Sequence, residues 1–131
     1  MGEAMASKEA KQYSPLALAF LGDAVYGLYI RERLIRKANT PVKKLHSASV
    51  EKVKATFQSE IARLIEPMLS DEEADVLRRG RNASTNNVPK GANSAQYHYA
   101  TGLEALFGYL YLIGDFERME KFIDIAWEHG E

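Results

Sequence analysis

The run Leu16-Ala17-Leu18-Ala19-Phe20-Leu21-Gly22-Asp23-Ala24-Val25-Tyr26-Gly27-Leu28-Tyr29-Ile30 is the most apolar stretch of this 131-residue chain, and it contains a single acid. Ser14-Pro15 precedes the run as a helix N-cap followed by a first-turn proline. No Gly-Pro or Asn-Gly break occurs before Asn39, so the pattern predicts one helix from about Ser14 to Lys37. Asp23 therefore lies in mid-helix, half surrounded by apolar neighbours.

A carboxylate at this position needs a partner. The residues one turn before and one turn after Asp23 on its helical face are Ala19, Phe20, Tyr26 and Gly27, and none of them is charged. Burying an unpaired charge costs on the order of several kcal/mol, which is comparable with the net stability of a whole domain. We expect Asp23 to meet a cation, a hydrogen-bond donor or a metal ion.

Length and composition favour a single globular domain. The chain has no cysteine, which excludes disulfides, a thiolate zinc site and a cysteine nucleophile. No apolar stretch is long enough to cross a bilayer, and the polar start lacks the apolar core of a signal peptide. We expect a cytoplasmic protein without a membrane partner, in which residues 1–12 are a flexible tail and residues 13–131 form the domain.

The net charge of −1 conceals an uneven distribution of charged residues. Eight Lys and Arg residues lie between Arg31 and Lys54, against two acids, whereas residues 115–131 hold six acids and two bases. Arg78, Arg79, Arg81 and Lys90 form a second basic group without an intervening acid. Such basic segments are typical of a surface that binds a polyanion.

No strand-like alternation of apolar and polar residues occurs, so the sequence predicts an all-α fold of five to seven helices around one core. Beyond the first helix, the expected helices cover residues 41–69, 71–79, 94–113 and 115–129. Ser70 and Glu73 have the spacing of a capping box, and Gly80 is the expected end of the helix that they open. The helix over 41–69 has its core stripe at Leu45, Val50, Val53, Phe57, Ile61, Leu64 and Ile65.

The stretch over residues 81–94 is the longest loop signal, rich in Asn, Ser, Gly and Pro. Its polar side chains suit phosphate and ribose oxygens, although a merely solvated connection is an equal alternative. The candidate nucleic-acid contacts in and around it, together with two lysines of the first basic segment, are Arg78, Arg79, Arg81, Asn82, Ser84, Thr85, Asn86, Lys90, Lys43 and Lys44.

A second acid, Glu104, has the same surroundings as Asp23. Each acid is followed by Ala, an aliphatic residue, an aromatic residue and Gly, and small residues let helices approach closely. If the two faces meet, the two carboxylates need a shared proton or a divalent cation. Oxygen ligands on helices suit Mg²⁺, with Mn²⁺ as an alternative. That each acid instead pairs structurally within the core stays open at this point.

Leu18–Val25 resembles the signature helix of the ribonuclease III family, Leu-Glu-Phe-Leu-Gly-Asp-Ala/Ser. Ala100–Gly108 resembles the second acidic helix of that family, Ala-Asp-x-x-Glu-Ala-x-x-Gly. The order and spacing of the two motifs also match, and the resemblance covers the chain from about Tyr13. Because no double-stranded-RNA-binding domain follows, the chain is similar to the short members that consist of the catalytic domain alone.

The resemblance implies a Mg²⁺-dependent endoribonuclease that cleaves double-stranded RNA as a homodimer, with Asp23 and Glu104 as catalytic and metal-binding residues. It further implies maturation of the precursor of large-subunit (23S) ribosomal RNA, with a ribosomal protein as a conceivable partner that presents the substrate. Exposed apolar residues of the first helix, such as Phe20, Val25 or Leu28, are then expected to be buried against the second subunit.

Two positions depart from the family pattern. Ala19 stands where the larger family has a metal-site Glu, and Thr101 stands where it has an Asp. Water, Thr101 or the RNA phosphate would have to complete the coordination of the ion. These departures keep two alternatives open: a catalytically weak helical module for RNA binding or ribosome assembly, and a dimeric helical scaffold whose acids pair internally.

Overall fold

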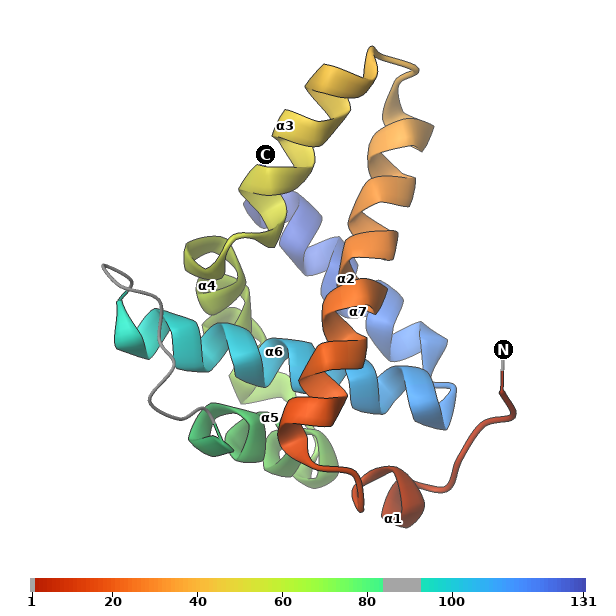
Figure 1. Cartoon of the computed structure of the whole chain (residues 1–131), viewed down its shortest axis with the longest axis vertical. Helices are drawn as coiled ribbons and strands as arrows, with labels where there is room; N and C mark the ends of the chain where they lie inside the picture. The colour runs from red at the N-terminus through yellow and green to blue at the C-terminus, as the bar shows by residue number, and fades with distance from the viewer. Residues whose placement is uncertain (1, 84–92) are drawn as a thin grey trace.

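The computed structural model describes residues 2–83 and 93–131, and within these ranges it contains helices and no strand. This finding confirms the expected all-α fold. Figure 1 shows the helices in their spatial order. They are α1 (Ser7–Ala10), α2 (Pro15–Lys37), α3 (Val42–Val53), α4 (Ala55–Ile65), the 3₁₀ turn η1 (Glu66–Met68), α5 (Asp71–Ala83), α6 (Ser94–Ile113) and α7 (Phe116–His129).

Helix α6 is the centre of the domain. Its buried residues lie on every side of the helix, and α2, α4 and α5 all pack against it (Figure 1). The N-cap residue of the helix is Asn93, whose side chain accepts a hydrogen bond from the backbone N–H of Gln96. The C-cap residue is Gly114, which has a left-handed backbone conformation. The fully buried side chains of α6 include Leu103, Leu106 and Leu110.

The crossing of α2 and α6 depends on two glycines. A Cβ atom at Gly22 would lie 1.6 Å from the backbone oxygen of Glu104, and one at Gly108 would lie 2.0 Å from the backbone oxygen of Leu18. The two backbones are therefore in direct contact, and no side chain fits between them. This contact brings the segments around Asp23 and Glu104 together.

A third glycine, Gly80, lies at a helix boundary that was predicted incorrectly. The expected end at Gly80 is wrong, because α5 continues to Ala83 and Gly80 lies inside it. A Cβ atom at Gly80 would lie 2.9 Å from the Cα of Gly102 and 2.8 Å from the Cβ of Ala105. The glycine thus permits the close approach of α5 to α6 and does not cap a helix.

The single helix expected over residues 41–69 is also wrong. Lys54 has an extended backbone (ψ 154°) and separates α3 from α4, and η1 follows α4. Val50 and Leu64 are exposed although they were expected in the core, because Val50 lies before the break and the buried face of α4 follows Ile61, Ala62 and Ile65. Ile61 and Ile65 of the same stripe are fully buried.

The N-terminal segment packs on the domain, which differs from the tail expected over residues 1–12. Ala10 is fully buried, and the Met5 N–H donates a 2.8 Å hydrogen bond to the carbonyl oxygen of Leu112. The segment is too short to show helical periodicity in the sequence, and its partners lie far along the chain. No helix of the described residues is long and apolar enough to cross a bilayer.

The capping box at the start of α5 is confirmed. The Ser70 N–H donates to Glu73 Oε1 (2.9 Å), and the Glu73 N–H donates to Ser70 Oγ (3.2 Å). Glu73 is buried and also accepts two hydrogen bonds from the Arg118 guanidinium, at 2.6 and 2.8 Å. These contacts, above all the pairing with Arg118, hold the pKa of Glu73 below its usual value against the effect of burial. Glu73 therefore joins α5 to α7 as a structural residue.

Candidate active site

The α2–α6 crossing brings the carboxyl groups of Asp23 and Glu104 within hydrogen-bond reach of each other. The two motif faces therefore meet, which answers the question that the repeated sequence pattern left open. Glu104 is half-buried, whereas Asp23 is exposed, which corrects the expectation that core residues half surround it. The reason is its position at the edge of the crossing, where its neighbour Ala24 also faces outward.

The surroundings of Glu104 favour its protonated form. Burial, followed by the hydrogen bond and the charge of Asp23, raises the pKa of Glu104 to about 8. The side chain of Gln58 opposes this shift, because its amide stabilises the carboxylate. At neutral pH the pair therefore holds a proton between its two carboxyl groups unless a cation replaces that proton.

Gln58 is a site residue that was not predicted from the sequence. It lies on α4, is buried beside Glu104, and its Nε2 makes no hydrogen bond of good geometry to the described residues. Its side chain nevertheless opposes the rise in the pKa of Glu104 that burial and Asp23 cause. The available signal was its spacing of three and seven residues from Ile61 and Ile65, which places Gln58 on the apolar face of the helix.

The donor set fits a hard divalent cation. The described residues contain no group of three or more His, Asp or Glu side chains that could hold a metal ion, so two carboxylates are what the protein supplies in this part. Thr101, one turn before Glu104, is buried and donates from Oγ1 to the Tyr97 carbonyl (3.0 Å), which leaves its oxygen lone pairs available. Ala19, also buried, offers no ligand. Such oxygen donors suit Mg²⁺ or Mn²⁺, with water completing the coordination.

Tyr26 fixes the apolar side of the site. Its hydroxyl donates to the Lys52 carbonyl (2.8 Å), and its ring packs edge-to-face on Phe107 at 5.3 Å between centroids. Burial raises the pKa of Tyr26, and the nearby charge of Glu104 adds to the effect. The tyrosine is therefore a neutral structural residue that joins α2 to the α3–α4 junction.

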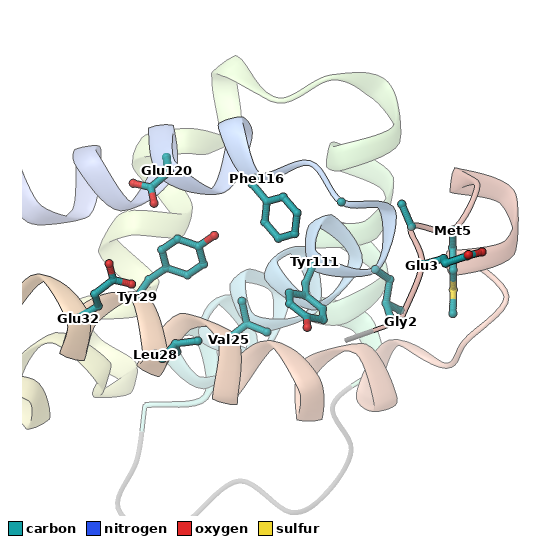
Figure 2. Close-up of a pocket in the computed structure, with 13 residues that line it drawn as sticks. Gly2, Glu3, Met5, Val25, Leu28, Tyr29, Glu32, Tyr111, Phe116 and Glu120 are labelled. Atoms are coloured by element: carbon teal, nitrogen blue, oxygen red, sulfur yellow. The ribbon is translucent and has the colours of Figure 1, made fainter.

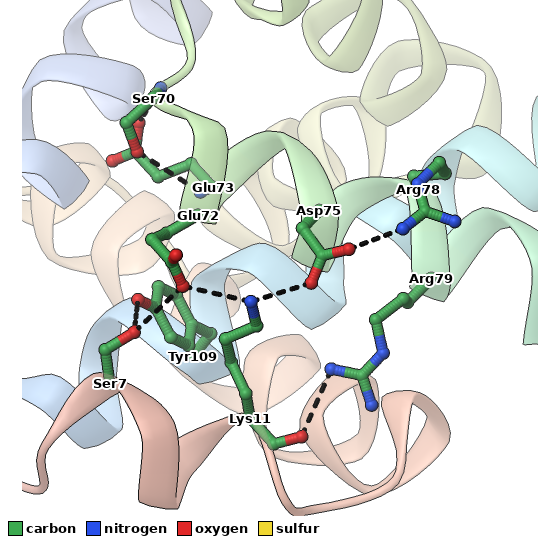
Figure 3. Close-up of polar contacts among 9 residues, drawn as sticks. All are labelled: Ser7, Lys11, Ser70, Glu72, Glu73, Asp75, Arg78, Arg79 and Tyr109. Carbon is green, nitrogen blue, oxygen red and sulfur yellow. Dashed lines mark hydrogen bonds and ion pairs between the residues drawn. The ribbon is translucent and has the colours of Figure 1, made fainter.

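The candidate RNA contacts on α5 have different surroundings. Arg78 is exposed and forms an ion pair with Asp75, and Asn82 is exposed. Arg79 instead donates to the Lys11 carbonyl (3.1 Å), as Figure 3 shows, so its guanidinium holds the N-terminal segment. Arg81 lies over the Tyr99 ring at 4.1 Å and forms a 3.5 Å ion pair with Glu66.

Other candidates lie apart from the carboxyl pair. Lys43 and Lys44 are exposed at the start of α3. Lys37, at the end of α2, is fourteen positions beyond Asp23, which corresponds to roughly 20 Å of helix, so these lysines are distant from the crossing. The remaining candidates lie outside the described residues: Ser84, Thr85, Asn86 and Lys90.

A second guanidinium near Arg81 was not anticipated from the sequence. Arg63 of α4 lies over the same Tyr99 ring, 4.4 Å from its centroid. The two arginines come from helices that are separate in sequence, so their convergence on one aromatic residue has no local signature. The cluster links α4, α5 and the start of α6.

Comparisons with known proteins agree with this geometry. The family model of the ribonuclease III domain matches residues 16–115. A Mini-ribonuclease 3 of Thermoanaerobacter is 51% identical over 113 residues, which are 86% of this chain and 80% of that protein. A Mini-ribonuclease 3 of Symbiobacterium thermophilum is 46% identical over 112 residues, 86% of either chain.

A crystal structure of a Fusobacterium nucleatum protein superposes with a TM-score of 0.84 at 33% identity, covering 91% of this chain and 95% of that one. The family match, the relatives and the shared fold thus agree over most of the sequence. The chain belongs to the ribonuclease III family, whose members are endoribonucleases that act on double-stranded RNA.

Proposed function

We propose that this chain is a Mg²⁺-dependent endoribonuclease in which Asp23 and Glu104 hold the ion, with Mn²⁺ as an alternative. The observation that carries the proposal is the meeting of the two carboxyl groups at the glycine crossing, where Glu104 has a pKa of about 8. Residues 13–131 form the catalytic domain in this proposal. The family membership supports the reaction class.

Each residue of the site has a distinct task. Bound Mg²⁺ would supply activation of a water molecule and neutralisation of charge on the scissile phosphate. Glu104 gives up its proton when the cation is present, because a nearby positive charge favours the carboxylate. The Gln58 amide stabilises the resulting carboxylate, and Asp23 is the solvent-exposed member of the pair.

We assign the contacts to the duplex to basic and polar residues of α5 and α3, some of them distant from the crossing. Double-stranded RNA is recognised largely by shape, through phosphates and 2′-hydroxyls spaced along the helix. Exposed Arg78 and Asn82 on α5 and exposed Lys43 and Lys44 on α3 offer separated contacts of this kind. Arg81 and, from the sequence alone, Ser84, Thr85, Asn86 and Lys90 complete the proposed RNA-binding set, whereas Arg79 has a structural contact instead.

The outer face of α2 supports a homodimer. Phe20 is 85% exposed and Leu28 is 59% exposed, whereas Val25, which was expected to join them, is 6% exposed and belongs to the core. An apolar cavity of about 430 Å³ lies beside Leu28 (Figure 2). Phe20 and Leu28 share a face and are roughly 12 Å apart along the helix. A two-fold axis near Ala24 therefore places Phe20 of each copy at the cavity of the other.

The charge around the cavity favours a protein partner over RNA. Glu3, Glu32 and Glu120 line the cavity, and the neighbouring outer face of α7 also carries acids. A polyanion is repelled by such a rim, whereas an aromatic side chain from a second copy needs only apolar surface. We therefore assign the acidic side to the dimer contact and the basic segments to RNA.

We further propose the precursor of 23S ribosomal RNA as the substrate, the cytoplasm as the location, and a ribosomal protein as a partner that presents the substrate. These assignments rest on the resemblance to the short members of the family. The alternative is a catalytically weak module for RNA binding or ribosome assembly, and the favouring observation is that Ala19 and Thr101 replace two carboxylates of the larger family.

Cleavage of a perfect RNA duplex tests the proposal. We expect cutting by the wild-type chain with Mg²⁺, none with a chelator, and a loss of at least about 100-fold in Asp23→Asn. Asp71→Asn, the same change at an exposed acid on α5, is the matched control and should cut normally. Equal cutting by the two variants would refute the role of Asp23, and RNA binding without cutting by the wild type would favour the alternative.

A further inference from the structure

We propose that residues 2–5 form one wall of the socket that receives Phe20 of a second copy, which makes the N-terminal segment a dimerisation element. The socket is the apolar cavity of about 430 Å³ beside Leu28. This inference rests on the proposed homodimer and adds a segment that the family motifs do not include, since the matched family model begins at residue 16.

The socket has walls from three parts of the chain. Helix α2 contributes Val25, Leu28 and Tyr29, and the α6–α7 corner contributes Tyr111 and Phe116. Gly2, Glu3, Ala4 and Met5 line the remaining side. Figure 2 shows Gly2, Glu3 and Met5 at the opposite end of the cavity from Tyr29 and Glu32. Without this segment, the cavity would be open at that end.

The wall is attached to the turn between α6 and α7. The Met5 N–H donates to the Leu112 carbonyl (2.8 Å). Gly114 ends α6 with a φ of +74°, and a Cβ atom there would lie 3.1 Å from the Cβ of Ala4. The glycine thus allows both the left-handed turn and the close contact with Ala4, so the backbone of residues 4–5 has a defined place.

A polar network fixes the following residues independently of the wall. Ser7 Oγ and Tyr109 Oη are 2.6 Å apart, and Lys11 Nζ lies 2.9 Å from Glu72 and 2.8 Å from Asp75 (Figure 3). Pairing with Asp75, then with Glu72, raises the pKa of Lys11. The fully buried Ala10 adds an apolar anchor. Removal of residues 2–5 should therefore leave α1 in place.

The occupant of the socket is argued from the molecule's own surface. Phe20 is the most exposed of the large apolar side chains in the described residues, and the exposed Leu28, about two turns further along α2, lines the socket. Phe20 protrudes from α2, and the cavity that receives it lies beside the same helix. A two-fold rotation can therefore bring Phe20 of each copy to the cavity of the other. Phe20 of one copy then contacts residues 2–5 of the other.

Sedimentation equilibrium on three variants tests the assignment. Deletion of residues 2–5, the wall variant Ala4→Asp, and Phe20→Ala should each raise the dimer dissociation constant at least tenfold. The helical circular-dichroism signal should stay unchanged. Lys8→Ala, which alters an exposed residue of α1 outside the socket, is the control and should dimerise as the wild type does.

Mixing two defective chains separates a contact between copies from a defect within one copy. A heterodimer of Phe20→Ala with the deletion variant keeps one intact contact, between Phe20 of the deleted chain and the wall of the other. We expect heterodimers at concentrations at which either variant alone is monomeric, and RNA cleavage should recover with them.

The outcomes distinguish this inference from the proposed function. The role of residues 2–5 would be refuted if the deletion variant and Ala4→Asp both dimerised as the wild type does. It would also be refuted if the mixture formed no excess of heterodimer. Neither result would contradict the Phe20 interface. Wild-type dimerisation by Phe20→Ala would overturn the proposed interface itself. Loss of RNA cleavage in Asp23→Asn is independent of either result.

Discussion

The two faces of α2 are both apolar, yet they differ in what covers them. On the inner face, Gly22 touches the backbone of α6, and Tyr26 is buried against Phe107. On the outer face, Phe20 and Leu28 protrude beside a cavity. Both faces of α2 are apolar because each packs against other protein surface. The inner face packs against α6 of the same chain, and in our proposal the outer face packs against a second copy. The carboxyl pair lies at the edge between them.

The largest effect is expected from a methyl group at the inner face. In Gly22→Ala the new Cβ would lie 1.6 Å from the Glu104 backbone oxygen, so the helices must separate, at a cost of about 3 kcal/mol or more. Gly27→Ala is the matched control, because its Cβ would meet only the mobile end of the Arg31 side chain. Urea denaturation measures both. Equal stability of the two variants would mean that the crossing is not the close contact described.

The carboxyl pair predicts a pH-dependent stability without metal. The pKa of Glu104 is raised from 4.5 to about 8, so the folded state binds the proton more tightly than the unfolded state. This stabilisation is complete below about pH 4.5 and is lost as pH rises through about 8, with a total of the order of a few kcal/mol. Thermal melts in chelator should show the decline, and Mg²⁺ should offset it at pH 8.

Glu104→Gln provides the control for that decline. An amide does not titrate, so the melting temperature of Glu104→Gln should vary less between pH 5 and 8 than that of the wild type. A wild-type profile as flat as that of Glu104→Gln would contradict the coupling of the two carboxyl groups.

A smaller effect is expected at Tyr26, on the inner face. Tyr26→Phe keeps the ring against Phe107 but removes the hydroxyl that donates to the Lys52 carbonyl. One lost hydrogen bond should lower the free energy of unfolding by about 1 kcal/mol. Tyr13→Phe, at an exposed tyrosine before α2, should leave that free energy unchanged. A loss at both positions would point to a general effect of the hydroxyl removal.

The sequence predicted the parts of the structure that have local signals. Ser14 accepts the capping hydrogen bond that its position suggested, and Ser70 and Glu73 form the expected capping box. The repeated motif of acid, Ala, aliphatic, aromatic and Gly also raised the question whether Asp23 and Glu104 meet, and the structure brings them within hydrogen-bond reach. Their catalytic role stays a prediction, because geometry alone does not test it.

The features that the sequence did not reveal depend on contacts between distant residues. The break at Lys54 has no Gly or Pro to mark it. Gly80 has the appearance of a helix end, and only its proximity to Gly102 shows a packing role. Gln58 gains its significance from Glu104, which lies on another helix. Met5 acquires a defined place only through Leu112.

The smallest effect on folding is expected on the outer face of α2, and it completes the comparison. Phe20→Ala should change the free energy of unfolding of the monomer by no more than about 0.5 kcal/mol, because the side chain is already in water. Phe107→Ala, at the buried ring against Tyr26, should cost about 3 kcal/mol, close to the loss expected for Gly22→Ala. The measurement must be made at protein concentrations where both chains are monomeric, since dimerisation adds stability by mass action. A large loss for Phe20→Ala under those conditions would place Phe20 in the core of the single chain, and the two faces of α2 would then not differ as proposed.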